Sequence, residues 1–311
     1  MLHITNGDSV AVPLLQTSLG GEAFAWRDAY HEGPVRSGER SRLIDARAAF
    51  LSSCGWGEED AIRDELLARD ARFVAALRDG QEIVLWFEHD LYDQLQLVDV
   101  LALAGETGFD PEQLELIEVG AFPGRPGFRG LGELNPPQLE SLWPSRRPVT
   151  DEDTAGAQRA WEAVRRADPR GLAEVQLNPP ASRPFLGAAL ARLVEELPAV
   201  RDGLSRTERQ LLQLLSEGPL LTGALFVASQ DREEAPFHGD TWLLRTLAEL
   251  TPLVMLTEGS AEITDLGRRV LAGDEDRVEV LGIDRWVGGT HLVPGAVWRW
   301  DAAASALVAP S

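Results

Sequence analysis

The chain contains no lysine and a single cysteine, Cys54. One cysteine cannot form an intramolecular disulfide, so the sequence gives no support for an oxidising compartment. All 29 basic residues are arginine, and 50 aspartate and glutamate residues outweigh them to give a formal net charge of -21. Because affinity for nucleic acids depends mainly on cationic contacts to phosphates, this balance disfavours a nucleic-acid ligand.

Long apolar runs are missing as well. No stretch of about 18 apolar residues occurs, and the start MLHITNGDS lacks the charged and apolar regions of a secretion signal. The sequence therefore predicts a cytoplasmic protein that does not use a membrane. Its 311 residues, 44% of them hydrophobic and 25% charged, have a globular composition and a length that favours two domains.

Common catalytic and cofactor motifs are also absent. The sequence has no Gly-rich dinucleotide fingerprint, no P-loop ending in Gly-Lys-Ser/Thr and no Gly-x-Ser-x-Gly elbow. A glycine-rich loop, GRPGFRG, carries Arg125 and Arg129, which could close over a phosphate or carboxylate, although such a stretch is more often a surface loop. The motifs thus leave the reaction unassigned.

Four short segments rich in aliphatic, aromatic or β-branched residues are predicted strands: 2–5, 22–26, 82–87 and 114–119. Segments with apolar residues at helical spacing lie between them, over 42–52, 58–77 and 91–104. This alternation predicts an α/β domain over residues 1–147, with an open, mainly parallel, Rossmann-like sheet flanked by helices.

Two further parts are predicted after this domain. Residues 148–203 form a helical connector, in which two helical patterns flank the proline-rich segment QLNPPASRP. Residues 204–311 begin with Ser205 and Glu208 at capping-box spacing, followed by three helices, a small hairpin and another helix. This order predicts a winged-helix-like α+β domain.

A winged-helix outline raises DNA binding as an alternative function. The helix that would enter the groove, 240–250, carries only one cation, Arg245. Residues 204–311 contain nine arginines against sixteen acidic residues, the wrong sign for a phosphate-binding surface. We expect this domain to pack on the first domain or to contact a protein partner.

Each of the first three predicted strands runs into a cluster of polar residues. The carboxyl ends of parallel strands lie along one edge of a sheet, where such folds usually bind ligands, so we expect these clusters to converge. The candidate residues are Asn6, Asp8 and Ser9 after the first strand, Trp26, Asp28, His31 and Glu32 at the second, and Glu88, His89, Asp90, Asp93 and Gln94 at the third.

Imidazoles and carboxylates in one cleft suit general acid–base catalysis or ligation of a divalent metal, which is the one candidate cofactor. The predicted catalytic residues are His31, His89, Asp28 and Glu88. The predicted metal ligands are Asp28, His31, His89 and Asp90. The residues predicted to bind the substrate are Asn6, Asp8, Ser9, Trp26, Glu32, Asp93 and Gln94.

Some of these polar residues have a structural alternative. Aspartate and serine after a strand also cap the helix that follows, so Asp8 or Ser9 could cap the first helix and Asp90 the helix after the third strand. For Asp8 and Asp90, a capping role and a role in the site both stay open. Because His31 and His89 follow two strands at equivalent positions, the pair favours a functional role over a structural one.

The motifs HITNGDS, WRDAYHEGPV and WFEHDLYDQLQL, with GIDRWVGGTHL further along, resemble a bacterial family of uncharacterised proteins. It is the domain-of-unknown-function family numbered eighteen thirty-five. The resemblance covers the N-terminal third through the first three motifs, and similar members carry a C-terminal extension like the winged-helix-like one here. It implies a site at the same strand-end residues and assigns no chemistry to them.

These observations predict a protein that binds or transforms a small polar molecule at the strand-end cleft, with phosphorylated and nucleotide-like molecules among the candidates. In this hypothesis His31 or His89 is the general base, and a divalent metal assists. The alternative is a regulatory or adaptor protein. In that case the α/β domain senses a ligand and the winged-helix-like domain contacts a protein or, less favourably, DNA.

Overall fold

The computed structural model describes residues 1–110 and 112–310, which form two compact units. Unit 1 comprises Met1–Leu190 and Gly288–Thr290, and unit 2 comprises the other described residues from Ala191 onward. Unit 1 therefore continues beyond residue 147 and includes most of the segment expected as a connector. The two units are described separately.

Unit 1 is built on a five-stranded sheet with the order β2-β1-β3-β4-β5. The first four strands are parallel, and β5 runs antiparallel to β4. The mainly parallel sheet predicted from the sequence is thus confirmed. The strands are β1 (Leu2–Thr5), β2 (Glu22–Ala25), β3 (Ile83–Glu88), β4 (Leu114–Val119) and β5 (Arg147–Pro148).

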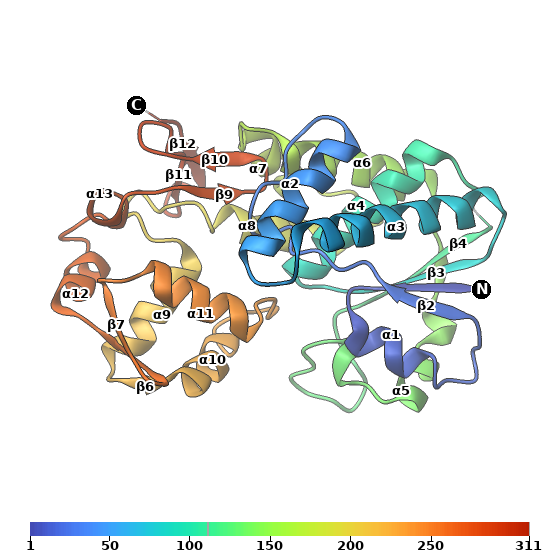
Figure 1. Cartoon of the computed structure of the whole chain (residues 1–311), viewed down its shortest axis with the longest axis horizontal. Coiled ribbons are helices and arrows are strands. Elements are labelled where there is room, and N and C mark those ends of the chain that lie inside the picture. The colour runs from blue at the N-terminus through green and yellow to red at the C-terminus, as the bar shows by residue number, and fades with distance from the viewer. Residues whose placement is uncertain (111, 311) are drawn as a thin grey trace. The chain divides into compact units, whose positions relative to one another are not determined.

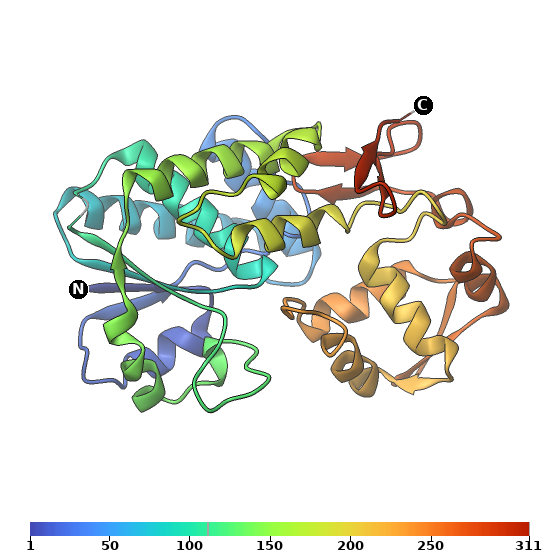
Figure 2. The same ribbon diagram turned by 180° about the vertical axis from the view of Figure 1, so that it is seen from behind.

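Helices cover both faces of this sheet (Figures 1 and 2). α1 and α5 lie on one face, and α2, α3, α4 and α6 lie on the other. The elements are α1 (Asp8–Leu14), α2 (Arg40–Ser53), α3 (Glu59–Arg78), α4 (Leu91–Thr107), η1 (Leu131–Glu133), α5 (Pro136–Ser141), η2 (Trp143–Ser145), α6 (Asp151–Arg165) and α7 (Arg170–Leu177). α8 (Leu186–Val194) runs from unit 1 into unit 2.

The central strand β3 is buried along its whole length, in keeping with its sequence IVLWFE. A parallel strand between two helical layers needs apolar side chains on both faces, so it reads as a continuous apolar run. On one face Val84 and Trp86 pack with Val10 and Leu14 of α1. This packing holds the carboxyl end of β3 beside the start of α1.

The two longest helices of unit 1 are α3 and α4. α3 is 20 residues long and has arginine and acidic residues along most of its length. α4 is mostly buried and apolar, but it is 17 residues long. Among the residues that the structure describes, no helix is both long and apolar enough to cross a membrane.

Unit 2 contains three helices, a hairpin and a further helix in the predicted order, with a short strand, β6 (Leu220–Leu221), before the second helix. Ser205 Oγ accepts a hydrogen bond from the backbone N–H of Glu208, and the Glu208 carboxylate accepts one from Ser205, which completes the predicted capping box. The elements are α9 (Arg206–Ser216), β6 (Leu220–Leu221), α10 (Thr222–Gln230), α11 (Asp240–Glu249), β7 (Val254–Thr257), β8 (Ser260–Ile263), α12 (Asp265–Ala272), α13 (Arg277–Leu281), β9 (Arg285–Val287), β10 (Thr290–Leu292), β11 (Arg299–Asp301) and β12 (Ala306–Val308).

Candidate functional site

The strand order of unit 1 reverses between β1 and β3. After β1 the chain passes through α1 to β2 on one side of β1, and then returns through α2 and α3 to β3 on the other side. α1 and α4 consequently leave the two neighbouring strand ends toward opposite faces of the sheet (Figure 1). Open α/β sheets bind their ligands at such a switch point. Asn6 follows β1 here, and Glu88 ends β3.

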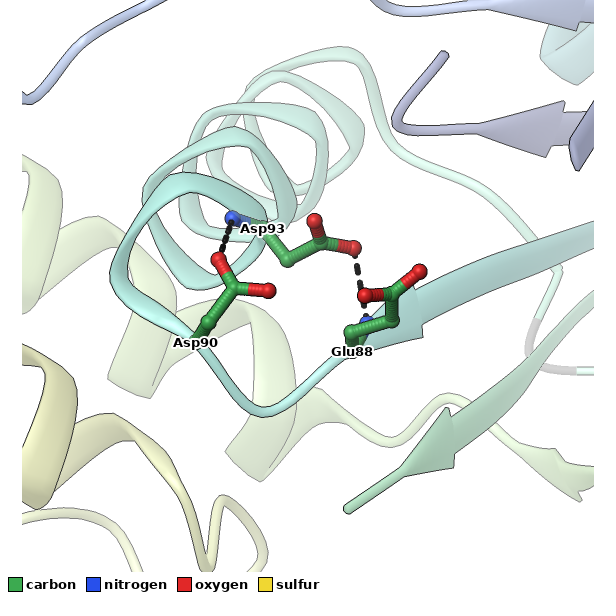
Figure 3. A group of neighbouring side chains, drawn as sticks. All are labelled: Glu88, Asp90 and Asp93. Atoms are coloured by element: carbon green, nitrogen blue, oxygen red, sulfur yellow. Dashed lines mark hydrogen bonds between the residues drawn. The ribbon is translucent and has the colours of Figure 1, made fainter. Parts of the chain in front are cut away.

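Three carboxylates meet at this switch point (Figure 3). Glu88, Asp90 and Asp93 each offer an oxygen, and these oxygens all lie within 4.8 Å of one another. The local fold explains the grouping, because Glu88 is the last residue of β3, Asp90 is the N-cap of α4 and Asp93 lies in the first turn of that helix. All three are at most 5% exposed. We call these three residues the carboxylate cluster.

A frame of hydrogen bonds holds the cluster in place. The backbone N–H of Glu88 donates to Asp93 Oδ1 at 2.7 Å, and the N–H of Asp93 donates to Asp90 Oδ1 at 3.1 Å. Asn6 Nδ2 donates to Asp93 Oδ2 at 2.7 Å and to Glu88 Oε1 at 3.4 Å. The N–H of Leu131 donates to Glu88 Oε1 at 2.6 Å. Residues from three distant segments therefore fix the carboxylate oxygens.

Gly130 closes over the Glu88 side chain. A Cβ atom at this position would lie 2.1 Å from Glu88 Oε2 and 2.7 Å from Glu88 Cδ. The backbone at Gly130 is extended, with φ 166°. Glycine is thus required by the closeness of the carboxylate and not by the backbone angle.

Burial and mutual repulsion dominate the electrostatics of the cluster. Burial, with the charge of Asp90 added, raises the pKa of Glu88 to about 8, and burial raises the pKa of Asp90 to about 7. The pKa of Asp93 is raised well above its usual range by burial and by the charges of Glu88 and Asp90. Near neutral pH the cluster therefore keeps protons or requires a cation.

Asp28, predicted as a catalytic residue and metal ligand, is held in a buried ion pair. Its Oδ1 accepts from Nε and Nη2 of Arg47 at 2.9 and 2.6 Å, and both side chains are about 1% exposed. Arg47 also donates to the backbone oxygens of Ala29 and Glu32. The pair fixes the loop after β2, and the guanidinium already balances the charge that Asp28 would offer to a metal.

The two predicted general bases lie close to α4 in different surroundings. His31 is 2% exposed, and its ring stands edge-on to Tyr92 with 5.8 Å between ring centroids. His89 is half-buried beside Phe185 at 5.7 Å, and burial lowers its pKa. Among the described residues, the carboxylate cluster is the only group of three metal-ligating side chains, so Asp28, His31 and His89 stand outside it.

Besides Asp93 of the cluster, two residues predicted to bind substrate are buried. Trp26 is fully buried, and its Nε1 donates to Asp99 Oδ2 at 2.9 Å, so its ring belongs to the core. Gln94 is also fully buried, and its Nε2 donates to the backbone oxygen of Glu88 at 2.6 Å and to Glu118 Oε1 at 2.8 Å. Gln94 thus holds the backbone of Glu88, a member of the cluster, in place.

Asp8 and Ser9 are exposed, and Glu32 is half-buried. Asp8 forms an ion pair with Arg27 and lines a cavity of about 420 Å³ along β2, between α1 and α3. The N-cap of α1 is Gly7, with no side-chain cap, so the structural alternative in which Asp8 or Ser9 caps this helix does not hold. Asp90 does cap α4, as its structural alternative had it, since its carboxylate accepts from the N–H of Asp93.

Three residues that contact this edge of the sheet were not predicted from the sequence: Gly130, Leu131 and Arg183. Gly130 is the last residue of the glycine-rich loop GRPGFRG and Leu131 follows it, whereas the candidate ligand groups of this loop were Arg125 and Arg129. The loop instead brings a backbone N–H and a close-packed glycine to Glu88. Arg183, in the proline-rich segment before α8, donates to Gln94 and Glu118. Only the glycines carried a local signal for this close approach.

Comparisons with protein-family models and with curated proteins give no match for this chain. The resemblance of its motifs to a bacterial family therefore stays a prediction, and the site is interpreted from its geometry.

Proposed function

We propose that unit 1 binds a divalent cation at the carboxylate cluster and, with it, a small polar molecule at the switch point between β1 and β3. The observation that carries this proposal is the meeting of three buried carboxylates within 4.8 Å at that point. Buried carboxylates this close repel one another, and a divalent cation removes the repulsion. Oxygen ligands of this kind suit Mg²⁺ or Ca²⁺.

A second observation supports a ligand at the same place. Oδ1 of Asn6 is buried and has no hydrogen-bond partner among the described residues, although Nδ2 of the same side chain binds Asp93 and Glu88. Buried polar atoms are rarely left unpaired in folded proteins. A polar group of a bound molecule, or a water on the cation, would complete the contacts of Asn6.

The chemistry that this arrangement supports is proton transfer or polarisation of a bound oxygen. A bound cation would draw electron density from a ligand oxygen and lower the pKa of a bound water. Cation binding would also release the protons that Glu88 and Asp90 hold near neutral pH, because their pKa values are about 8 and 7. The affinity for the cation is therefore expected to rise with pH over this range.

Calorimetric titration of the full chain with Mg²⁺, Mn²⁺ and Ca²⁺ tests the proposal. We expect saturable binding of at least one cation, with proton release seen as a dependence of the measured heat on the buffer. Asp90→Asn should abolish binding, whereas Asp8→Asn at the exposed, ion-paired Asp8 should leave it intact. Absence of binding by the wild type, or equal binding by Asp90→Asn, would falsify the proposal.

We also infer the finer features of the two units. The order β2-β1-β3-β4 supports a doubly wound, Rossmann-like domain for unit 1. In unit 2, the succession α9, β6, α10, α11, β7 and β8, with the sheet order β6-β8-β7, supports a winged helix. The family resemblance of the motifs and a cytoplasmic location stay part of this proposal.

A second candidate function is contact with a protein partner through unit 2. Apolar side chains are exposed on its helices and hairpin, among them Val227, Leu244 and Met255. Arg245, the one cation of the helix that would enter a DNA groove, pairs with Glu249 at 2.9 Å. Titration of fluorescent duplex DNA with the full chain at low salt should show no binding. Binding that weakens steeply with added salt would overturn this assignment in favour of DNA.

A further inference from the structure

The segment before α8 buries an arginine directly under the protein surface. Arg183 is fully buried, whereas the nearby Ala181 and Pro184 are exposed. Its Nη2 donates to Gln94 Oε1 at 3.0 Å and to Glu118 Oε1 at 3.2 Å. Its Nε and Nη1 are also buried, and neither has a hydrogen-bond partner among the described residues.

Unpaired donors on a buried guanidinium are costly, because the group loses its hydration without replacement. Burial accordingly lowers the pKa of Arg183, against the opposing charge of Glu118. The neighbouring hydroxyl, Ser182 Oγ, is buried without a partner as well. One short segment therefore carries three buried polar atoms that can donate hydrogen bonds and have no acceptor.

The same segment packs against the end of β3. Phe185 stands edge-on to the ring of His89, with 5.7 Å between centroids, and it also approaches Gly120 after β4. Nδ1 of His89 is buried without a partner among the described residues. A guanidinium, a hydroxyl and an imidazole are the side chains that commonly bind phosphate and carboxylate oxygens.

We propose that Arg183, with Ser182 and His89, forms an oxyanion site that takes a phosphoryl group. Nε and Nη1 of the guanidinium offer donors to an oxyanion, while Nη2 anchors the guanidinium to Gln94 and Glu118. Arg147 lies nearby, because its Nη2 donates to the backbone oxygen of Ser182 at 3.0 Å, but its charge is already paired with Asp153 at 2.7 Å. Glu118 offsets part of the charge of Arg183 at 3.2 Å, and Nε and Nη1 are the donors left for an incoming anion.

Gln94 links this oxyanion site to the carboxylate cluster. Its Oε1 accepts from Arg183, and its Nε2 donates to the backbone oxygen of Glu88 at 2.6 Å. A single carboxamide thus separates the guanidinium from the cluster. Divalent cations and phosphate groups are often bound together. Joining the two sites into one site for a phosphorylated molecule rests on the proposed function, whereas the oxyanion site does not.

Thermal unfolding of the full chain in inorganic phosphate tests the oxyanion site, with chelator present to remove divalent cations. Acetate and chloride at equal ionic strength serve as comparisons. We expect Tm to rise saturably with phosphate and to rise little with acetate or chloride. No rise in phosphate, or a rise in acetate alone, would overturn the assignment of a phosphoryl site.

Variants then locate the bound anion. Arg183→Met should weaken the apparent phosphate affinity roughly 10- to 100-fold, the loss expected for one charged hydrogen-bonding group. Arg146→Met is the matched control, because Arg146 is already paired with Glu115 and the backbone of Trp143. Ser182→Ala provides a milder change if Arg183→Met does not fold. An unchanged phosphate response in both Arg183→Met and Ser182→Ala would exclude the site.

The two proposals fail separately in these measurements. Asp90→Asn should lose the response to divalent cations and keep the response to phosphate in chelator. Arg183→Met should lose the response to phosphate in chelator and keep the response to Mg²⁺ or Mn²⁺ added without phosphate. A phosphate response that depends on Asp90 and not on Arg183 would place the anion on the carboxylate cluster and overturn the role of Arg183.

Discussion

Asn6 donates a hydrogen bond from Nδ2 to Oδ2 of Asp93 at 2.7 Å, across 87 residues of sequence. The bond joins the residue after β1 to the first turn of α4, which follows the neighbouring strand β3. The hydrogen bonds that hold the carboxylate cluster are therefore complete only after β1 and β3 have paired. The site therefore assembles only when this part of the sheet has folded.

The Asp90→Asn variant should make the cation-free protein more stable at pH 8. Asparagine caps a helix as well as aspartate does, and its amide can donate to the Glu88 carboxylate in place of the present repulsion. We expect the free energy of unfolding to rise by about 1 kcal/mol. Urea unfolding in chelator measures this change. A loss of stability would show that the negative charge of Asp90 is needed even without a cation.

The stability of the cation-free protein should fall as the pH rises from about 5 to 8. Burial raises the pKa of Glu88 from 4.5 to about 8 and that of Asp90 from 3.8 to about 7. A raised carboxyl pKa stabilises the folded state while the group is protonated, and this stabilisation disappears as the pH rises through the folded-state pKa. Ion-paired carboxylates such as Asp153, with a pKa of about 2, titrate below this range.

Urea unfolding in chelator at several pH values checks this dependence. Glu88→Gln, which cannot ionise, should flatten the decline. Added Mg²⁺ or Mn²⁺ should reverse it in the wild type, since a cation stabilises the ionised cluster. Stability that increases from pH 5 to pH 8 in chelator would contradict the raised pKa values.

Local patterns predicted the four parallel strands and the longer helices of unit 1, but not the antiparallel strand β5. The bounds of β1 and β4 match the predicted segments 2–5 and 114–119, and the ends of β2 and β3 differ by one residue. Each strand is a short apolar run followed by glycine or polar residues, which is a strong signal at short range. The spacing of Asp90 and Asp93 is local too, because both belong to the first turn of one helix.

The pairing of the polar side chains depends on distant segments and could not be predicted. Nothing near Asp28 in the sequence indicates that Arg47 of α2 will neutralise it. Trp26 follows a strand as a ligand-binding residue would, yet Asp99 of α4 accepts its N–H inside the core. Arg183 lies 89 residues beyond Gln94, its hydrogen-bond partner. Such contacts are set by how helices pack on the sheet.

Gly130→Ala should disrupt the site without removing any of its polar groups. The new Cβ would lie 2.1 Å from Glu88 Oε2, so the carboxylate must move away from the N–H of Leu131. We expect cation affinity to fall about tenfold or more and the free energy of unfolding to drop by about 1–3 kcal/mol. Gly7→Ala is a suitable control, since its nearest contact would be Ser9 Oγ at 3.8 Å. Unchanged cation affinity in Gly130→Ala would argue against Glu88 as a ligand.

Asp28→Ala distinguishes a structural role from the metal-binding role first predicted for Asp28. Removing the carboxylate leaves the Arg47 guanidinium buried and without its counter-charge. Breaking one side of a buried ion pair typically costs about 3–5 kcal/mol, and we expect a loss of unfolding free energy of this size. Cation affinity, measured by calorimetry at a temperature where the variant is folded, should stay within about twofold of the wild type, because Asp28 lies outside the carboxylate cluster. The double variant Asp28→Ala, Arg47→Met should recover part of the lost stability, since it leaves no unpaired charge. A variant that keeps its stability and loses its cation would instead restore Asp28 to the metal site.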